Sequence, residues 1–350
     1  MINRNNIYSI MKGLAIMGVV AGHLGINKID LFVNYWHLPV FFFVSGYFLK
    51  DKYINDGKKY VSSRFKRLII PFFFYASTAI ILHNFLINWG IIDGIKFVGN
   101  DYWVEIKRML LLSSNEQLIG AMWFLPALFF ISCIGWSLLK LHTIHHSLNY
   151  KWGGVICFIV GMLAINRNIS SPYCIFQYLS ITWIFLLGYM VRTEHLEEKI
   201  RNIIGVLVSI SILSVALFAK SRFGCQPSMI GNMPLCFPLV FISGIVIINY
   251  ISFQIQNYKI GKVLSFVGNY SFSIMALHFV GFKIVTFIHK LIDDTVTISD
   301  FPISSKNLYM WAPMYFLVGL AFPIVVSILG EKIKNAWCNN CRVQKSGANG

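Results

Sequence analysis

Ten runs of apolar residues, separated by short polar segments, follow one another along the 350-residue chain. A helix rises about 1.5 Å per residue, so about 20 apolar residues cross the roughly 30 Å hydrocarbon core of a bilayer. The pattern therefore predicts an all-α integral membrane protein with about ten transmembrane helices. We place these helices near residues 9–27, 34–49, 69–89, 119–138, 152–166, 176–191, 203–219, 235–252, 264–290 and 309–330.

The composition supports this class. Hydrophobic residues make up 56% of the chain and charged residues 13%, which excludes an ordinary soluble globular domain. The first apolar run continues into a multispanning chain, so we interpret it as structure and not as a cleaved signal peptide. Internal repeats and long polar linkers are absent from the sequence. We therefore expect one membrane domain over residues 1–334, followed by a polar cytoplasmic tail over residues 335–350.

Basic residues alternate along the chain in a way that predicts the orientation of the helices. With both termini in the cytoplasm, 20 of the 30 Lys and Arg residues fall in cytoplasmic segments, as the positive-inside rule requires. The densest cluster lies over residues 50–67. The net charge of +16 is then explained by topology and by contact with anionic membrane lipids, and a nucleic-acid partner is not needed.

Three histidines fall inside or at the ends of predicted spans. His23 lies in the outer half of the first span, His37 begins the second, and His278 lies in the ninth. An ionisable group costs several kcal/mol in hydrocarbon and is usually tolerated only in the protein interior, often in a functional site. A histidine whose ring hydrogen-bonds a backbone carbonyl is the structural alternative for each. Their similar predicted depth favours a shared catalytic site.

Lys12 and His23 stand at the two ends of one apolar stretch, K-G-L-A-I-M-G-V-V-A-G-H. Eleven residues along a helix correspond to about 1100° of rotation and about 16 Å of rise. We therefore expect one helix to hold the ammonium and the imidazole along the same face, at different depths in the membrane.

Five segments, in this order, resemble the acyltransferase 3 family of integral-membrane O-acyltransferases, and most nearly its fucose 4-O-acetylase-like branch. They are K-G-L-A-I-M-G-V-V-A-G-H-L, W-H-L-P-V-F-F-F-V-S-G-Y-F-L, R-F-K-R-L-I-I-P-F, M-W-F-L-P-A-L and Y-S-F-S-I-M-A-L-H. The resemblance covers roughly residues 5–330. It implies that His23 is the catalytic residue, and that the basic residue eleven positions earlier, usually arginine in the family, is Lys12 here.

The same residues make chemical sense as an acyl-transfer site. A neutral imidazole can accept the proton of an attacking hydroxyl, so we expect His23 to be the base, with His37 and His278 beside it. We expect Lys12, Arg64 and Arg67 to bind the phosphates of acetyl-CoA, although Arg64 and Arg67 also fit a positive-inside anchor. Ser45 and Trp123 are candidate substrate contacts. Their alternatives are a small residue at a helix contact and an interfacial aromatic residue.

These expectations define a function and its rivals. We expect acyl transfer from cytoplasmic acyl-CoA to a hydroxyl of a cell-surface or lipid-linked glycan, in the cytoplasmic membrane of a bacterium. No metal is expected, because the lone C-x-x-C at Cys338 and Cys341 is too weak a pattern for a zinc site. The alternatives are a transporter that relays protons through its histidines and a non-catalytic subunit of a glycan exporter. The absence of paired repeats disfavours the transporter.

Overall fold

The computed structural model describes residues 4–347 except 115, 146, 170 and 226–235, and over these residues every regular element is helical. The longer helices are α1 (Arg4–Gly22), α2 (Asn27–Asn34), α3 (His37–Tyr47), α5 (Gly57–Arg64), α6 (Ile70–Asn88), α7 (Asp101–Leu110), α8 (Phe124–Ile144), α9 (Tyr150–Asn166), α10 (Ile175–Thr193), α11 (Ile203–Phe218), α12 (Cys236–Ile255), α13 (Lys259–Asn269), α14 (Ser271–Ile292) and α15 (Leu308–Gly347). Short elements include α4 (Lys52–Asn55), a π-helical turn η1 (Phe65–Ile69) and a 3₁₀ segment η2 (Gln117–Trp123).

The predicted membrane class is confirmed. Within the described residues, six helical stretches are long and apolar enough to cross a bilayer, and α9 and α11 are shorter apolar helices. The helices that meet this length are therefore fewer than the ten apolar runs. The second run shows why, because its helix α3 has only 11 residues and is too short to cross hydrocarbon alone.

Two other helices differ from their predicted bounds. The first helix runs from Arg4 to Gly22 instead of 9–27, and the chain turns immediately afterwards, where Gly25 adopts a positive φ of 67°. The ninth apolar run is divided at Tyr270 into α13 and α14, so its spanning helix begins at Ser271 and not near 264. Hydropathy detects neither break, because the polar residues there, such as His23 and Asn269, are too few among apolar and small residues to interrupt the run. At the C-terminal end, α15 continues as a helix through the segment expected to be a tail.

Helix α1 lies at the centre of the bundle and packs against α3, α12, α13 and α14. Its crossing with α13 is backbone to backbone, since a Cβ at Gly13 would overlap the carbonyl oxygen of Leu264. Helices α3 and α10 cross in the same way, because a Cβ at Gly46 would overlap the carbonyl of Phe185. Close crossings of this kind are typical of membrane helices, and they bring the side chains of α1, α3 and α14 into one small region.

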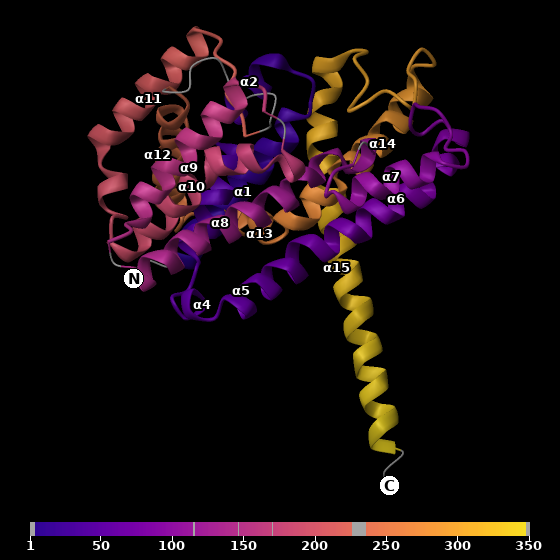
Figure 1. Ribbon diagram of the computed structural model, residues 1–350. Helices are drawn as coiled ribbons and strands as arrows, with labels where there is room; N and C mark the ends of the chain where they lie inside the picture. Colours follow the sequence, from indigo (N-terminus) through magenta and orange to yellow (C-terminus); the bar gives the residue numbers. More distant parts are fainter. Residues whose placement is uncertain (1–3, 115, 146, 170, 226–235, 348–350) are drawn as a thin grey trace.

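The bundle has two opposite faces (Figure 1). The N-terminus, α4 and α5 lie on one face, which we call the basic face because it carries the cluster at residues 50–67. Helix α2 lies on the other, which we call the opposite face. The C-terminal part of α15 extends away from the bundle on the side of the basic face. This arrangement agrees with the predicted topology, in which both termini and residues 50–67 share one side.

Candidate active site

A cavity of about 300 Å³ lies on the side of α2 and contains two of the predicted histidines. His23, which follows the last residue of α1, and His37, the first residue of α3, both line it. Trp123, at the end of η2, lines the same cavity. We call it the histidine cavity. Three residues predicted from separate parts of the sequence therefore meet in one space.

His278 lies directly behind this cavity. Its ring stacks on the ring of His23 with centroids 5.3 Å apart, and Phe279 contacts both rings at 4.8 and 4.2 Å. His278 is completely buried, whereas His23 is partly exposed to the cavity. The three histidines are thus brought together, with His23 and His37 in the cavity wall and His278 supporting His23.

The hydrogen bonds of two histidines fix which ring nitrogen carries the proton. The Nδ1–H of His37 donates to the carbonyl of Val33 at 2.5 Å, and the Nδ1–H of His278 donates to the carbonyl of Ile274 at 2.8 Å. Each of these two rings therefore makes the hydrogen bond to a backbone carbonyl that was the structural alternative to a catalytic role. It also leaves each Nε2 with a free lone pair in the neutral ring. Among the residues that the structure describes, the buried Nε2 of His278 has no hydrogen-bond partner.

Polar residues of α2 that the sequence analysis did not select also line the histidine cavity. They are Asn27, Asp30 and Asn34. The Asn34 side chain donates to the Asp30 carboxylate at 2.7 Å and to the Asp30 carbonyl at 2.8 Å. Burial raises the pKa of Asp30, while the hydrogen bond from Asn34 and the charge of Arg222 act in the opposite direction. The spacing of Asp30 and Asn34, four residues apart before a buried histidine, was the available sequence indication.

A second cavity, of about 480 Å³, contains the predicted donor-binding residues. Lys12 from α1, Arg64 from the end of α5 and Arg67 from η1 all line it, together with Lys50. We call it the basic cavity. Four cationic side chains around one space are suited to the phosphates of a nucleotide, and Arg can bind phosphate with two parallel hydrogen bonds.

The π-helical turn η1 has a local cause in the sequence. Pro71 lacks an N–H, so the carbonyl of Arg67 loses the donor that an α-helix would supply four residues later. The turn widens instead, and the N–H of Ile70 bonds the carbonyl of Phe65, five residues back. Such π turns are frequent at functional sites. Here the turn carries Arg67 and directly follows Arg64.

Ser45 lines the basic cavity, so it lies with Lys12 and not with the histidines. The close helix contact that was its structural alternative is made by the next residue, Gly46. The Ser45 hydroxyl is buried and has no hydrogen-bond partner in the part of the chain that the structure describes. A buried hydroxyl without a partner is unfavourable, so a ligand that bonds it in this cavity gains affinity.

The two cavities meet at common wall residues. Phe124 at the start of α8 and Met275 of α14 line both of them. A slim ligand whose charged end lies among Lys12, Arg64 and Arg67 would therefore point toward the histidines. Lys12 lies near the middle of α1, and His23 stands one residue beyond the end of the helix, so the two groups lie at different depths along it as the sequence predicts.

Comparison with known proteins gives one match. The model of the acyltransferase 3 family, described as an acyltransferase domain, matches residues 5–331. No curated protein and no solved structure matches the chain. The match covers all of the residues that line the two cavities, and it favours an acyltransferase over the transporter and the export subunit.

Proposed function

Because the chain belongs to the acyltransferase 3 family and is a multi-pass membrane acyltransferase, we propose that it moves an acetyl group from acetyl-CoA to a hydroxyl of a glycan. The observation that carries this proposal is the common wall of the basic and histidine cavities at Phe124 and Met275. Coenzyme A has phosphates at one end and a thioester at the end of a long, narrow arm. Two joined cavities of different chemistry match these two ends.

Lys12, Arg64 and Arg67 bind the donor phosphates in this proposal. The pantetheine arm passes Ser45, whose unpartnered hydroxyl is available to its amide groups. The thioester then reaches the wall formed by Phe124 and Met275. The donor approaches from the basic face, so we assign that face to the cytoplasm of a bacterial cell.

His23 acts as the general base toward the acceptor. Its neutral imidazole accepts the proton of the acceptor hydroxyl while the oxygen attacks the thioester carbonyl. The tetrahedral intermediate collapses, the carbon–sulfur bond breaks, and the imidazolium returns the proton to the departing thiolate. His37 and His278 keep the site polar on one side of His23, and Trp123 offers a flat surface for a sugar ring.

The acceptor enters the histidine cavity from the opposite face, as a cell-surface or lipid-linked glycan. Transfer then occurs across the membrane without movement of the donor through it. The order of the five motifs, and above all the first two, favours the fucose 4-O-acetylase-like branch.

A direct assay tests this proposal. The purified chain in lipid nanodiscs is given acetyl-CoA labelled in the acetyl group, together with glycan extracts from host cells that lack the gene. Label should enter the glycan fraction, and mass spectrometry of glycans from cells with and without the gene should differ by one O-acetyl group. Unlabelled glycan and identical spectra would contradict the proposal. A Lys96→Gln variant, changed on the surface away from both cavities, controls for preparation and yield.

A further inference from the structure

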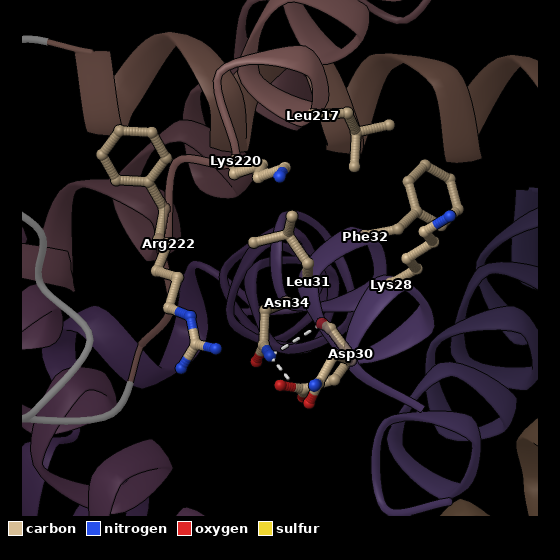
Figure 2. A pocket seen from close by; sticks show the side chains of 10 residues that line it. Lys28, Asp30, Leu31, Phe32, Asn34, Leu217, Lys220 and Arg222 are labelled. Carbon is tan, nitrogen blue, oxygen red and sulfur yellow. Dashed lines mark hydrogen bonds between the residues drawn. The ribbon is translucent and has the colours of Figure 1, made fainter. Parts of the chain in front are cut away.

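A third cavity, of about 580 Å³, lies between α2 and the segment that leaves α11 (Figure 2). Lys28 of α2 and Lys220 and Arg222 of the segment after α11 line it. Figure 2 shows these three side chains around Leu31. We call it the α2–α11 cavity. None of its three cations belongs to the proposed catalytic or donor-binding residues.

The gathering of these cations is not explained by topology. The positive-inside rule accounts for basic residues on the cytoplasmic face, whereas this cavity is on the side of α2. Of the 30 basic residues, Lys283 lies inside a predicted span and only nine are predicted on that side: Lys28, Lys96, Lys107, Arg108, Arg167, Lys220, Arg222, Lys290 and Lys306. Three of those nine line this one cavity. Within the described residues, no hydrogen bond or ion pair within 4 Å joins any of the three side chains to a partner. The three charges are therefore available to a ligand.

The segment that carries two of the cations is held in place. The hydroxyl of Tyr35, which follows α2, donates to the carbonyl of Ser221 at 2.6 Å, and the carbonyl of Ala216 is 3.2 Å away. Lys220 adopts a positive φ of 50°, a conformation that a lysine rarely takes without such support. The completely buried Tyr35 thus fixes the turn that presents Lys220 and Arg222 to the cavity.

One part of the cavity wall is apolar. Leu31, Phe32, Leu217 and Phe223 line the cavity beside the cations. Helix α11 is an apolar helix with many exposed hydrophobic side chains, and Phe218, next to Leu217, is 92% exposed. An apolar chain can therefore run from this cavity along α11 without leaving a hydrophobic environment.

The α2–α11 cavity is also joined to the histidine cavity. Asn27, Asp30 and Asn34 line both. A ligand with a negative group among the three cations can therefore extend over α2 toward His23. The Asp30 carboxylate stands at this junction and accepts a hydrogen bond from Asn34, and its single negative charge leaves an excess of positive charge from the three cations.

We propose that the α2–α11 cavity binds a phosphate group carried on an apolar chain, and that this phosphate belongs to the lipid carrier of the glycan acceptor. The identity of the acceptor comes from the proposed function. The phosphate is inferred from the residues that line the cavity. Lys28, Lys220 and Arg222 bind the phosphate, the apolar chain lies against Phe32 and α11, and the attached sugar reaches the histidine cavity. Phosphate among several Lys and Arg side chains forms charge-assisted hydrogen bonds.

Binding of geranylgeranyl diphosphate to the full chain in nanodiscs tests this inference without any turnover. Coenzyme A is present in excess, so that the basic cavity is filled. The double variant K220Q/R222Q should bind the probe at least tenfold more weakly than the unchanged chain, and Tyr35→Phe should also weaken binding. The matched variant K96Q/K107Q removes two charges outside this cavity, at exposed positions of the loop before α7 and of α7 itself, and should bind normally.

The controls separate the sources of the phosphate. Geranylgeraniol, which lacks phosphate, and inorganic pyrophosphate, which lacks the chain, should each bind at least tenfold more weakly than the probe. Equal binding by K220Q/R222Q and the unchanged chain would overturn the site. Displacement of the probe by phosphatidylglycerol at similar concentration would overturn the assignment to the acceptor, because the site would then hold bulk lipid. Probe binding needs no turnover, so retained probe binding by an unchanged chain that transfers no acetyl group would count against the proposed function alone.

Discussion

Phe124 and Met275 both line the basic cavity and the histidine cavity, so the two cavities have these two residues in common. Met275 is 4% exposed and stands three residues before His278 on α14, whereas Phe124 begins α8 and contacts Phe41 and Phe42. In the proposed function, these two apolar side chains form the wall between the donor in the basic cavity and the acceptor in the histidine cavity. In the proposed function, the size of these two side chains sets the space for the acyl group beside His23.

Met275→Ala should enlarge the acyl space. We expect the ratio of turnover with butyryl-CoA to turnover with acetyl-CoA to rise about tenfold, because each methylene accommodated in an apolar pocket is worth roughly 1–3 kcal/mol. Steady-state kinetics with both donors measures this ratio. Met122→Ala, which truncates a buried methionine outside both cavity walls, is the control for general loosening of the core. An unchanged ratio in Met275→Ala would show that the acyl group does not pass this wall.

His23→Ala should remove most of the turnover and leave donor binding intact. A general base acts only as the proton moves, and its loss typically costs 10²–10⁴ in rate. Single-turnover kinetics and a separate titration of coenzyme A distinguish the two effects. His145→Ala, at an exposed position of a loop, provides the matched histidine substitution. Turnover by His23→Ala within tenfold of the unchanged chain would remove the base assignment.

Transfer should decrease as the pH is lowered. A neutral imidazole accepts a proton and an imidazolium does not, so the pH–rate profile should have an acid limb on which turnover falls as the base becomes protonated. Asp30 lines the same cavity, and burial raises the pKa of its carboxyl. The Asp30→Asn substitution removes the titration of this carboxyl group. The limb should keep its position in Asp30→Asn if it belongs to histidine, whereas its disappearance would assign it to the carboxylate.

The sequence predicted most helices because hydropathy alone determines which segments enter the membrane. The runs at 69–89 and 203–219 correspond closely to α6 and α11. The breaks at Gly22 and Tyr270 were not predicted, because they depend on how α1, α13 and α14 pack and not on local polarity. Helix α2 was not predicted because it contains several polar residues, and hydropathy does not distinguish such a segment from a loop.

The sequence selected candidate side chains that the structure brings close together, but it did not predict how they are arranged. The cost of burying charge selected His23, His37 and His278, and the structure brings these three together. Only tertiary packing could show that Ser45 lies with Lys12, or that Asp30 lies with the histidines. The number of cavities and their common wall likewise depend on contacts between α1, α3, α8 and α14 that no single segment encodes.

Lys12→Ala should raise the apparent KM for acetyl-CoA about tenfold or more and preserve much of the turnover. A residue that holds the donor phosphates contributes equally to the ground and transition states, so its loss affects binding and not the chemical step. Lys12→Arg keeps the charge and should retain activity. Donor titration kinetics on the three proteins test this. Unchanged donor affinity in Lys12→Ala would show that Lys12 does not bind the donor in the basic cavity.

Lys283 connects the opposite face to the histidines and should be a positioning residue. Its Nζ, on α14, donates to the carbonyls of Ile298 and Asp300, both at 2.9 Å, and lies 5.9 Å from the ring centroid of Phe301. The Phe301 ring is 4.9 Å from that of Phe279, which contacts His23. The buried ammonium of Lys283 therefore holds the loop after α14 so that Phe301 packs on Phe279, the ring that contacts His23.

Lys283→Met should release this loop without unfolding the bundle. Hydrogen bonds to a charged group are worth about 1.5–3 kcal/mol each, so amide hydrogen exchange at residues 298–301 should accelerate, and turnover should fall about tenfold with donor affinity unchanged. Lys290→Met is the matched control, because Lys290 donates to the Val296 carbonyl at 3.0 Å from the same helix. It should keep turnover within about twofold. Faster exchange in Lys283→Met with full turnover would show that the position of Phe301 does not govern His23.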